Sequence, residues 1–300
     1  MSNATATVGH VLVGVEEGSH QQDVVRHAAR QAELHHSPLH ILHVIEGHGP
    51  AGDDADQEAG QGSDATLAAR GASLVEPLAA LVRLEFPGLM VTAEAVAGRA
   101  AEVLLDRSSK VASLVLGHRG SGGFPRLPLG SVSWQVATHA DCPVLIVRPQ
   151  ESSAAPEQRV VVGVDISDVS EESLDLAYAE AAARGARLEL LHANFHLSEL
   201  PTGPGMVVPD FKALDEAAHR ALEAAAAERR DRFPRVQVDT RVERVRPSTI
   251  LTEASHGAAL LVVGSHGRTG LRRLMLGSVS AETLHTAACP VLVVPPLTHD

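Results

Sequence analysis

Gly264-Ser265-His266-Gly267 is followed nine residues later by Gly277-Ser278-Val279-Ser280, and this stretch has an earlier copy in the chain. In that copy, Gly117-His118-Arg119-Gly120 precedes Gly130-Ser131-Val132-Ser133 by the same interval. Each copy follows a run of leucine and valine and leads into a Cys-Pro-Val segment. Because the offset between equivalent residues is constant throughout the stretch, the chain carries an internal duplication.

The glycines and serines of this pattern suit the binding of a phosphate group. Glycine lets backbone N–H groups approach an anion closely. A helix that begins at a Gly-Ser pair adds unpaired N–H groups and a favourable dipole. Ser278 and Ser280 are expected to add hydroxyl donors. The alternative is an ordinary turn from strand to helix, and the repetition of the pattern with one spacing argues against it.

The duplication predicts two domains, residues 1–150 and 157–300, joined by a linker at residues 149–157. A net charge of −12 argues against a protein that binds a nucleic-acid backbone. No apolar run reaches the ~18–20 residues of a membrane span, and the short polar N-terminus does not read as a signal peptide. Cys142 and Cys289 are expected to be core thiols. We therefore expect a cytoplasmic protein with no nucleic-acid or membrane partner.

Strand and helix patterns alternate in both halves, which is typical of a parallel α/β sheet. The predicted strands are residues 10–15, 39–45, 89–97, 112–117 and 144–148, then 159–165, 188–193, 236–243, 259–264 and 291–294. The predicted helices are residues 19–35, 64–86, 99–110 and 131–140, then 168–184, 210–233, 248–256 and 278–288. Capping boxes, Ser19 with Gln22 and Asp168 with Glu171, are predicted to begin the first helix of each half.

An acidic residue ends the first predicted strand of each half. Val162-Gly163-Val164-Asp165 and Val13-Gly14-Val15-Glu16 are equivalent segments. A carboxylate at the carboxyl end of a strand, beside a phosphate-binding loop, can bind a ribose hydroxyl or a magnesium ion. The alternative is an acid that only caps a turn or a helix.

Together these motifs resemble those of the universal stress protein family, in its nucleotide-binding class. The family motif G-x2-G-x9-G-[ST] is met by Gly264, Gly267, Gly277 and Ser278, and again by Gly117, Gly120, Gly130 and Ser131. The family's first strand is matched by residues 162–165, its second strand end by His43-Val44 and loosely by His192-Ala193, and its closing segment by both Cys-Pro-Val runs. The resemblance covers nearly all of the chain except the linker and two long loops.

The resemblance implies an α/β chain of two similar doubly wound domains. Each would hold a five-stranded parallel sheet in the order 3-2-1-4-5, with helices on both faces. In that order the first and fourth strands are neighbours where the winding reverses, and ligands bind at that crevice. The resemblance also implies that the protein binds ATP. The adenine would lie against the ends of the first two strands, and the acid would contact the ribose or a magnesium ion. AMP or another adenine nucleotide stays open.

The resemblance implies a set of ligand-binding residues in each half. In the second half they are Val164, Asp165, Ala193, Gly264, Gly267, Gly277, Ser278, Val279 and Ser280, with Arg268 as a candidate phosphate contact and Asp165 as the candidate contact to nucleotide-bound magnesium. In the first half they are Val15, Glu16, Val44, Gly117, Gly120, Gly130, Ser131, Val132 and Ser133.

The first half departs from the family pattern at two places. Glu16 stands where the family has aspartate, which extends the carboxylate by one methylene. Pro125 and Pro128 lie within the loop, where each fixes φ and removes an N–H donor. We therefore expect the second half to hold the stronger site.

The functional expectation is an ATP-binding regulatory protein of the stress response and not an enzyme. The chain has no G-x4-G-K-[ST] loop and no evident catalytic base. The alternatives are a slow ATPase or other nucleotide-using enzyme, and a module that binds a protein partner without nucleotide. We also expect the halves to pair through their last strands about a pseudo-twofold axis, with a homodimer as a further arrangement.

Overall fold

A computed structural model of the chain describes residues 9–18, 20–46, 60–119, 129–148, 157–167, 169–194, 210–265 and 276–296, with side chains from residue 70 onward in the second helix. The chain divides into two compact units, Met1–Pro149 and Gln150–Asp300. In the described residues no helix is both long enough and apolar enough to cross a membrane.

The first unit alternates strands and helices from beginning to end. Its elements are β1 (Val11–Val15), α1 (Gln21–Leu34), β2 (Leu39–Ile45), α2 (Gly60–Glu85), β3 (Val91–Ala97), α3 (Ala100–Ser108), β4 (Ser113–Gly117), α4 (Ser131–His139) and β5 (Val144–Val147). The strands are parallel and lie in the order β3-β2-β1-β4-β5. This is the predicted doubly wound order.

The second unit repeats the arrangement. Its elements are β6 (Glu157–Gly163), α5 (Glu171–Arg184), β7 (Arg187–Ala193), α6 (Phe211–Arg229), β8 (Val238–Glu243), α7 (Pro247–Ser255), β9 (Ala258–Gly264), α8 (Ser278–Thr286) and β10 (Val291–Val294). Its parallel strands lie in the order β8-β7-β6-β9-β10. The predicted fold class is therefore confirmed for both halves.

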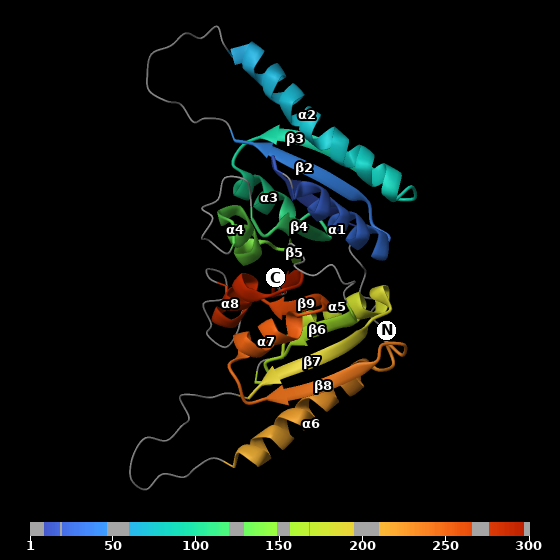
Figure 1. Cartoon of the computed structure of the whole chain (residues 1–300), viewed down its shortest axis with the longest axis vertical. Coiled ribbons are helices and arrows are strands. Elements are labelled where there is room, and N and C mark those ends of the chain that lie inside the picture. Colours follow the sequence, from blue (N-terminus) through green and yellow to red (C-terminus); the bar gives the residue numbers. More distant parts are fainter. Residues whose placement is uncertain are drawn as a thin grey trace, which may run out of the picture. The chain divides into compact units, whose positions relative to one another are not determined.

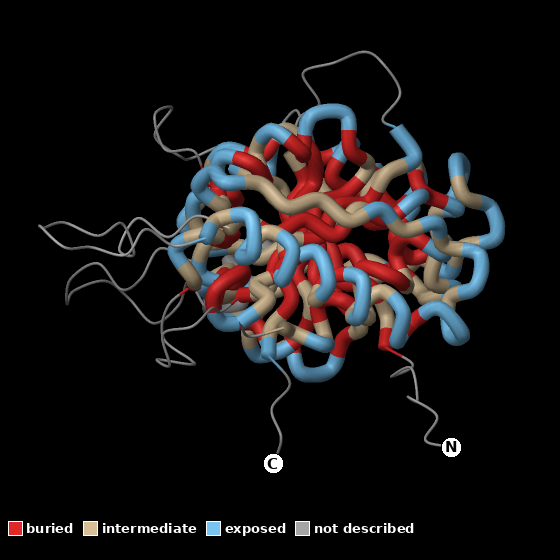
Figure 2. The backbone as a smooth tube through the Cα atoms, turned by 90° about the horizontal axis from the view of Figure 1, so that it is seen from below, coloured by how far each residue is buried: buried red, intermediate tan, exposed pale blue. Residues whose placement is uncertain are grey.

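Helices cover both faces of each sheet (Figure 1). In the first unit α1 and α2 pack together over one face, and α3 and α4 pack together over the other. In the second unit α7 packs against α8, and Tyr178 of α5 reaches α6 through a hydrogen bond to the Ala226 carbonyl oxygen. The central strands are buried on both faces, and the exposed residues lie on the outer sides of the helices (Figure 2). This explains why the strand sequences are nearly continuous apolar runs.

The glycine within each first strand makes room for a helix. A Cβ atom at Gly14 would lie 2.6 Å from Leu116 Cδ2 and 3.4 Å from Leu104 Cδ2. A Cβ atom at Gly163 would lie 3.1 Å from Leu251 Cδ2. Gly163 therefore serves the close packing of α7 on the sheet, and Gly14 makes room mainly for Leu116 of β4 and then for Leu104 of α3.

Several element ends differ from the prediction. β6 runs from Glu157 to Gly163, two residues before the predicted span, and α6 ends at Arg229 and not at residue 233. α5 begins at Glu171, and its N-cap is Ser170, whose hydroxyl accepts a hydrogen bond from the Ser173 N–H at 3.2 Å. The predicted cap residues Ser19 and Asp168 lie outside the described residues.

Candidate functional site

The sheet order brings the end of the first strand level with the Gly-Ser loop in each unit. β6 pairs with β9 so that Val162 is the partner of Val262, which places Val164 level with Gly264. β1 pairs with β4 so that Val13 is the partner of Val115. The acid and the loop, predicted as separate motifs, therefore meet where the winding reverses, as expected for this class of sheet.

In the second unit the helix start is tied to the strand ends by backbone hydrogen bonds. The Ser265 N–H donates to the Val294 carbonyl oxygen at 2.8 Å, and the Gly277 N–H donates to the Ser265 carbonyl oxygen at 2.8 Å. Residues 266–275, which include the candidates Gly267 and Arg268, lie outside the described residues. The structure therefore describes the two ends of the loop.

The first turn of α8 presents unpaired backbone donors. Gly277 is the N-cap and has no side chain with which to cap the helix. The first hydrogen bond of the helix runs from the Ala281 N–H to the Gly277 carbonyl oxygen at 2.8 Å. The N–H groups of Ser278, Val279 and Ser280 therefore have no acceptor within the helix, and such groups attract an anion.

The first unit has the same geometry. The His118 N–H donates to the Val147 carbonyl oxygen at 2.8 Å, and the Gly130 N–H donates to the His118 carbonyl oxygen at 2.8 Å. Gly130 is the N-cap of α4, and no side chain caps that helix either. The first-turn N–H groups that follow belong to Ser131, Val132 and Ser133. Gly120 and the loop prolines lie outside the described residues.

Two of the serines have a structural partner that the sequence did not predict. The Ser280 hydroxyl donates to the Gly264 carbonyl oxygen at 2.6 Å, and the Ser133 hydroxyl donates to the Gly117 carbonyl oxygen at 2.7 Å. Both serines are buried, whereas Ser278 and Ser131 are exposed. The expectation that Ser280 donates its hydroxyl to a ligand is therefore corrected, because that proton joins the helix to the strand end.

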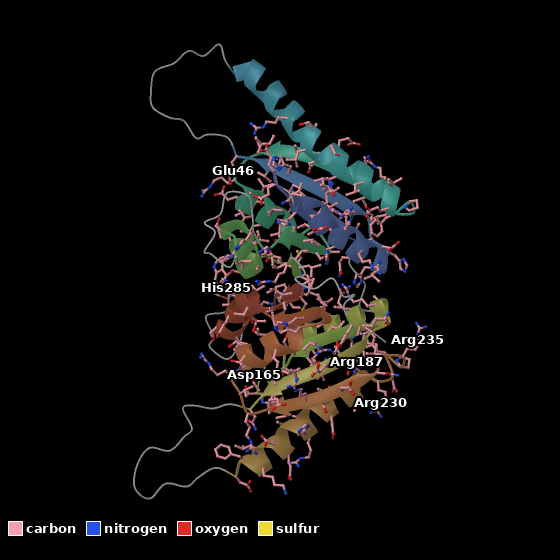
Figure 3. The ribbon with its side chains drawn as sticks, in the orientation of Figure 1. Glu46, Asp165, Arg187, Arg230, Arg235 and His285 are labelled. Atoms are coloured by element: carbon pink, nitrogen blue, oxygen red, sulfur yellow. The ribbon has the colours of Figure 1, made fainter. Side chains whose placement is uncertain are left out.

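Asp165 lies at the carboxyl ends of the strands of its unit, and Arg187 lies at the opposite end (Figure 3). One carboxylate oxygen, Oδ1, accepts hydrogen bonds from the Ser167 N–H at 3.0 Å and the Ser167 hydroxyl at 2.5 Å. The turn therefore fixes the carboxylate, and Oδ2 has no hydrogen-bond partner in the described part of the chain. The turn-capping role and a ligand-binding role are compatible.

Glu16, the equivalent acid of the first unit, has a different setting. Its backbone N–H donates to Gln21 Oε1 at 3.3 Å. Gly18 stands at the position of Ser167, so the hydroxyl donor that holds Asp165 has no equivalent in the first unit.

A histidine near the end of the second strand holds the end of the first strand. His43 Nδ1 lies 2.8 Å from the Val15 carbonyl oxygen, and His192 Nδ1 lies 2.8 Å from the Val164 carbonyl oxygen. Because the acceptor is a carbonyl oxygen, Nδ1 carries the proton in both rings. His192 is 6% exposed, and its Nε2 has no hydrogen-bond partner among the residues described. This role of the histidine was not predicted, although a histidine near the end of an apolar strand in both halves was the signal.

Basic side chains gather beside the loop of the first unit. The pKa of His118 is lowered to about 4, chiefly by burial and then by the positive charges of Arg148, Arg119 and His20. His118 is therefore neutral near pH 7. At the positions of His118 and Arg148 the second half has Ser265 and Pro295. This difference between the halves was not predicted.

Two further expectations concern metal ions and cysteines. Among the described residues, no group of three or more His, Cys, Asp or Glu side chains could hold a metal ion. Cys142 and Cys289 are free and buried, and burial is the main cause that raises the pKa of Cys142 to about 12. The cysteines are core thiols, as expected.

The chain was then compared with known proteins. The sequence model of the universal stress protein family matches residues 7–148 and 157–295. A universal stress protein of Mycolicibacterium smegmatis is 35% identical over 299 residues, covering 97% of this chain and 99% of that protein. A universal stress protein of Mycobacterium tuberculosis is 33% identical over 300 residues, covering 98% of each. These relatives are named as stress proteins and not as enzymes.

The solved structures agree at the level of the fold. A universal stress protein from Archaeoglobus fulgidus is 19% identical, with a TM-score of 0.65, over 98% of this chain and 99% of that one. At this identity the likeness establishes the fold alone.

Proposed function

Because the chain belongs to the universal stress protein family, we propose that it is a regulatory stress-response protein that binds ATP in its Gly-Ser loops, more tightly in the second half. The observation that supports this most is the first turn of α8, where three N–H groups without helical acceptors lie at the reversal point of the sheet. An anionic group is the natural ligand of such a turn.

The other contacts of the nucleotide follow from the strand ends. Val164 and Ala193 lie where β6 and β7 end, and they would contact the adenine. The free Oδ2 of Asp165 would accept a ribose hydroxyl or bind a magnesium ion on the phosphates, since the other oxygen is fixed by the turn. Exposed Ser278 can donate its hydroxyl to a phosphate, and Arg268 is a further candidate contact.

The preference for the second half rests on the difference between the two acids. Asp165 Oδ1 is held by Ser167, and its Oδ2 has no partner in the described residues, whereas Glu16 is longer by one methylene and is followed by Gly18 at the position of Ser167. A lost hydrogen bond to a charged group costs about 1.5–3 kcal/mol, which is roughly tenfold or more in affinity.

Matched substitutions of the two N-cap glycines test this proposal. Gly277 has φ −57° and ψ 144°, and Gly130 has φ −71° and ψ 151°, so alanine fits both backbones without strain. The added methyl group would stand where the phosphate binds. We expect Gly277→Ala to remove the tighter phase of an ATP titration and Gly130→Ala to leave it. Equal losses, or the reverse order, would contradict the asymmetry. Formation of ADP in a single-turnover assay would show that the protein is instead an ATPase.

A further inference from the structure

In each unit the edge strand and the helix before it form an edge segment. The segments are α2 with β3, residues 60–97, and α6 with β8, residues 211–243. The remaining elements of each unit are called its body. β3 pairs with β2 from Leu39↔Val91 onward, and β8 pairs with β7 in the same register from Leu188↔Val238 onward. Backbone hydrogen bonding alone therefore does not distinguish the two segments.

In the first unit an ion pair joins the helix of the edge segment to the body. Glu85, the last residue of α2, receives two hydrogen bonds from Arg26 of α1. Arg26 Nε lies 3.0 Å from Glu85 Oε2, and Nη2 lies 2.9 Å from Oε1. The side chains are 39% and 33% exposed. The segment thus supplies the anion and the body supplies the cation.

The second unit has this ion pair with its charges reversed. Asp175 of α5 accepts hydrogen bonds from Arg229 of α6, at 2.8 Å, and from Arg232, which follows α6. Arg232 is the equivalent of Glu85, since each precedes a Phe-Pro pair at the same distance before the edge strand. Asp175 is the equivalent of Arg26, because both lie equally far before the first paired residue of β7 or β2. Here the segment supplies the cations.

The edge strand of the first unit carries an anion as well. Glu94 of β3 accepts a hydrogen bond from Arg107 of α3. Its Oε1 also lies 3.0 Å from Nε2 of His40 on β2. The carboxylate of the segment therefore faces basic groups from two elements of the body.

The strand contact is also reversed in the second unit. The common register makes Arg241 of β8 the equivalent of Glu94. Arg241 lies 3.8 Å from Glu189 of β7 and 3.5 Å from Glu253 of α7. A cation of the segment therefore faces acidic groups from two elements of the body. The helix contact and the strand contact, which are separate in the fold, show the same reversal.

A further ion pair has the opposite polarity, but it is more exposed. Arg70 of α2 lies 3.0 Å from Glu17, with side chains 69% and 58% exposed. Such a pair contributes little to stability. The reversed contacts include side chains that are much less exposed, Arg229 at 5% and Glu189 at 13%. Because water and salt screen sheltered charges less, these contacts outweigh the exposed pair.

Exchange of the edge segments would bring like charges together at both contacts. The opposed residues would be Glu85 with Asp175 and Glu94 with Glu189 in one exchange, and Arg232 with Arg26 and Arg241 with Arg107 in the other. Repulsion in the wrong pairing, added to attraction in the right one, is how charged contacts discriminate between similar partners.

We propose that the reversed polarity is a pairing code, which admits each edge segment to the body of its own half and opposes its insertion into the other half. The excluded partner is the other half of the same chain or of a second copy. A chain that contains one fold twice is exposed to this error, because misassembly and swapping of equivalent elements are characteristic failures of repeated domains. The code does not depend on the binding of a ligand.

A single substitution reproduces the exchanged helix contact in the full chain. Glu85→Arg sets against Arg26 the residue that the second segment would bring, whereas Glu85→Gln removes the pair without repulsion. In urea titrations followed by the fluorescence of Trp134, we expect Glu85→Arg to favour unfolding roughly two- to fivefold more than Glu85→Gln does. Adding Arg26→Asp should remove that excess. A Glu85→Arg variant as stable as Glu85→Gln would overturn the proposal.

A variant with matched polarity tests the assembly itself. It gives the first half the residues of the second at five positions, by Arg26→Asp, His40→Glu, Glu85→Arg, Glu94→Arg and Arg107→Ala. Each segment then still complements its own body, but the two segments carry the same charges. After refolding from urea at rising protein concentration, size-exclusion chromatography should show a smaller monomer yield for this variant than for the unaltered protein.

Salt provides the matched control. At about 1 M NaCl the Debye length falls to about 3 Å. The monomer yield of the unaltered protein should then fall toward that of the variant, whose own yield should change little. If the fivefold variant does not fold, Arg26→Asp with Glu85→Arg makes the same comparison at the helix contact alone. Equal monomer yields of variant and unaltered protein, at low and at high salt, would overturn the proposal.

Discussion

Ser278 and Ser280 have different surroundings in the second half, although the sequence presents them as equivalent donors. The Ser280 hydroxyl joins α8 to the end of β9, whereas Ser278 is exposed. The pattern Gly-Ser-x-Ser therefore combines an exposed serine, the proposed ligand contact, with a serine that joins the helix to the strand. Spacing alone could not separate the two, because the distinction depends on which serine faces the strand.

Substitution of each serine should separate binding from stability. Ser280→Ala leaves the Gly264 carbonyl oxygen without its donor, and we expect it to lower the free energy of unfolding by about 1–2 kcal/mol. Ser278→Ala should leave stability unchanged and weaken ATP binding. Denaturant unfolding and calorimetric titration of both variants measure the two effects. A Ser280→Ala variant as stable as the unaltered protein would show that the tie contributes nothing.

Thr283 offers a stabilising change in the core. Its side chain is fully buried, and its hydroxyl has no hydrogen-bond partner among the residues described. The equivalent residue of the first half is Val136, which is also fully buried. We expect Thr283→Val to raise the free energy of unfolding by about 1 kcal/mol, since a buried unsatisfied hydroxyl is replaced by a methyl group of similar shape. The reverse change, Val136→Thr, should destabilise the first half, and a neutral result for both would contradict this explanation.

At the scale of elements, the alternating strand and helix patterns predicted a parallel α/β fold, and the family resemblance supplied the order of the strands. Their ends were less predictable, because local contacts determine them. Ser170 caps α5 in place of the predicted Asp168, and β6 starts two residues early at Glu157. The ties from His43 and His192 to the ends of β1 and β6 also depend on ring orientation, which no sequence pattern reports.

His118, which follows β4, is expected to make the stability of the first half depend on pH. The folded pKa of His118 is about 4, below the value of 6.5 in the unfolded chain. The unfolded state therefore binds more protons between these values, so stability is highest above pH 6.5 and falls as the pH approaches 4. Trp134, the single tryptophan of the chain, lies in α4 of the same unit and reports its unfolding by fluorescence.

Replacement of His118 by the residue of the second half checks this prediction. The urea midpoint of the unaltered protein, followed by Trp134 fluorescence, should be lower at about pH 5 than at about pH 7. In His118→Ser this difference between the two midpoints should be smaller. His20→Ser, at a more exposed basic position, is the control and should reduce it less. An unaltered protein with the same midpoint at both pH values would contradict the prediction.

At the scale of the whole molecule, the duplication supplies two sheets whose last strands, β5 and β10, are short apolar edges by sequence. An unpaired apolar edge tends to pair, and we predict that the two units join through these strands about a pseudo-twofold axis. Small-angle X-ray scattering should then give the profile of one compact particle. A profile of two lobes on an extended linker would contradict this pairing.

The candidate site was predictable in outline. The two glycine-serine pairs and the acids followed from the motifs, and their meeting followed from the strand order that the family resemblance implies. The unequal surroundings of the loops were not predictable, because Arg148 and His118 come together only through the pairing of β4 and β5. Gly267, Gly120 and Arg268 lie outside the described residues, and their contacts with a ligand stay predictions.

Calorimetric titration of the full chain with ATP and magnesium, together with its melting temperature, tests the central claim most directly. We predict a binding heat and a stabilisation that grows with ligand as RT ln(1 + [L]/Kd), about 2.7 kcal/mol at a hundredfold excess over Kd. Gly277→Ala should remove most of both effects. The absence of heat and of any melting shift in the unaltered protein would contradict the account.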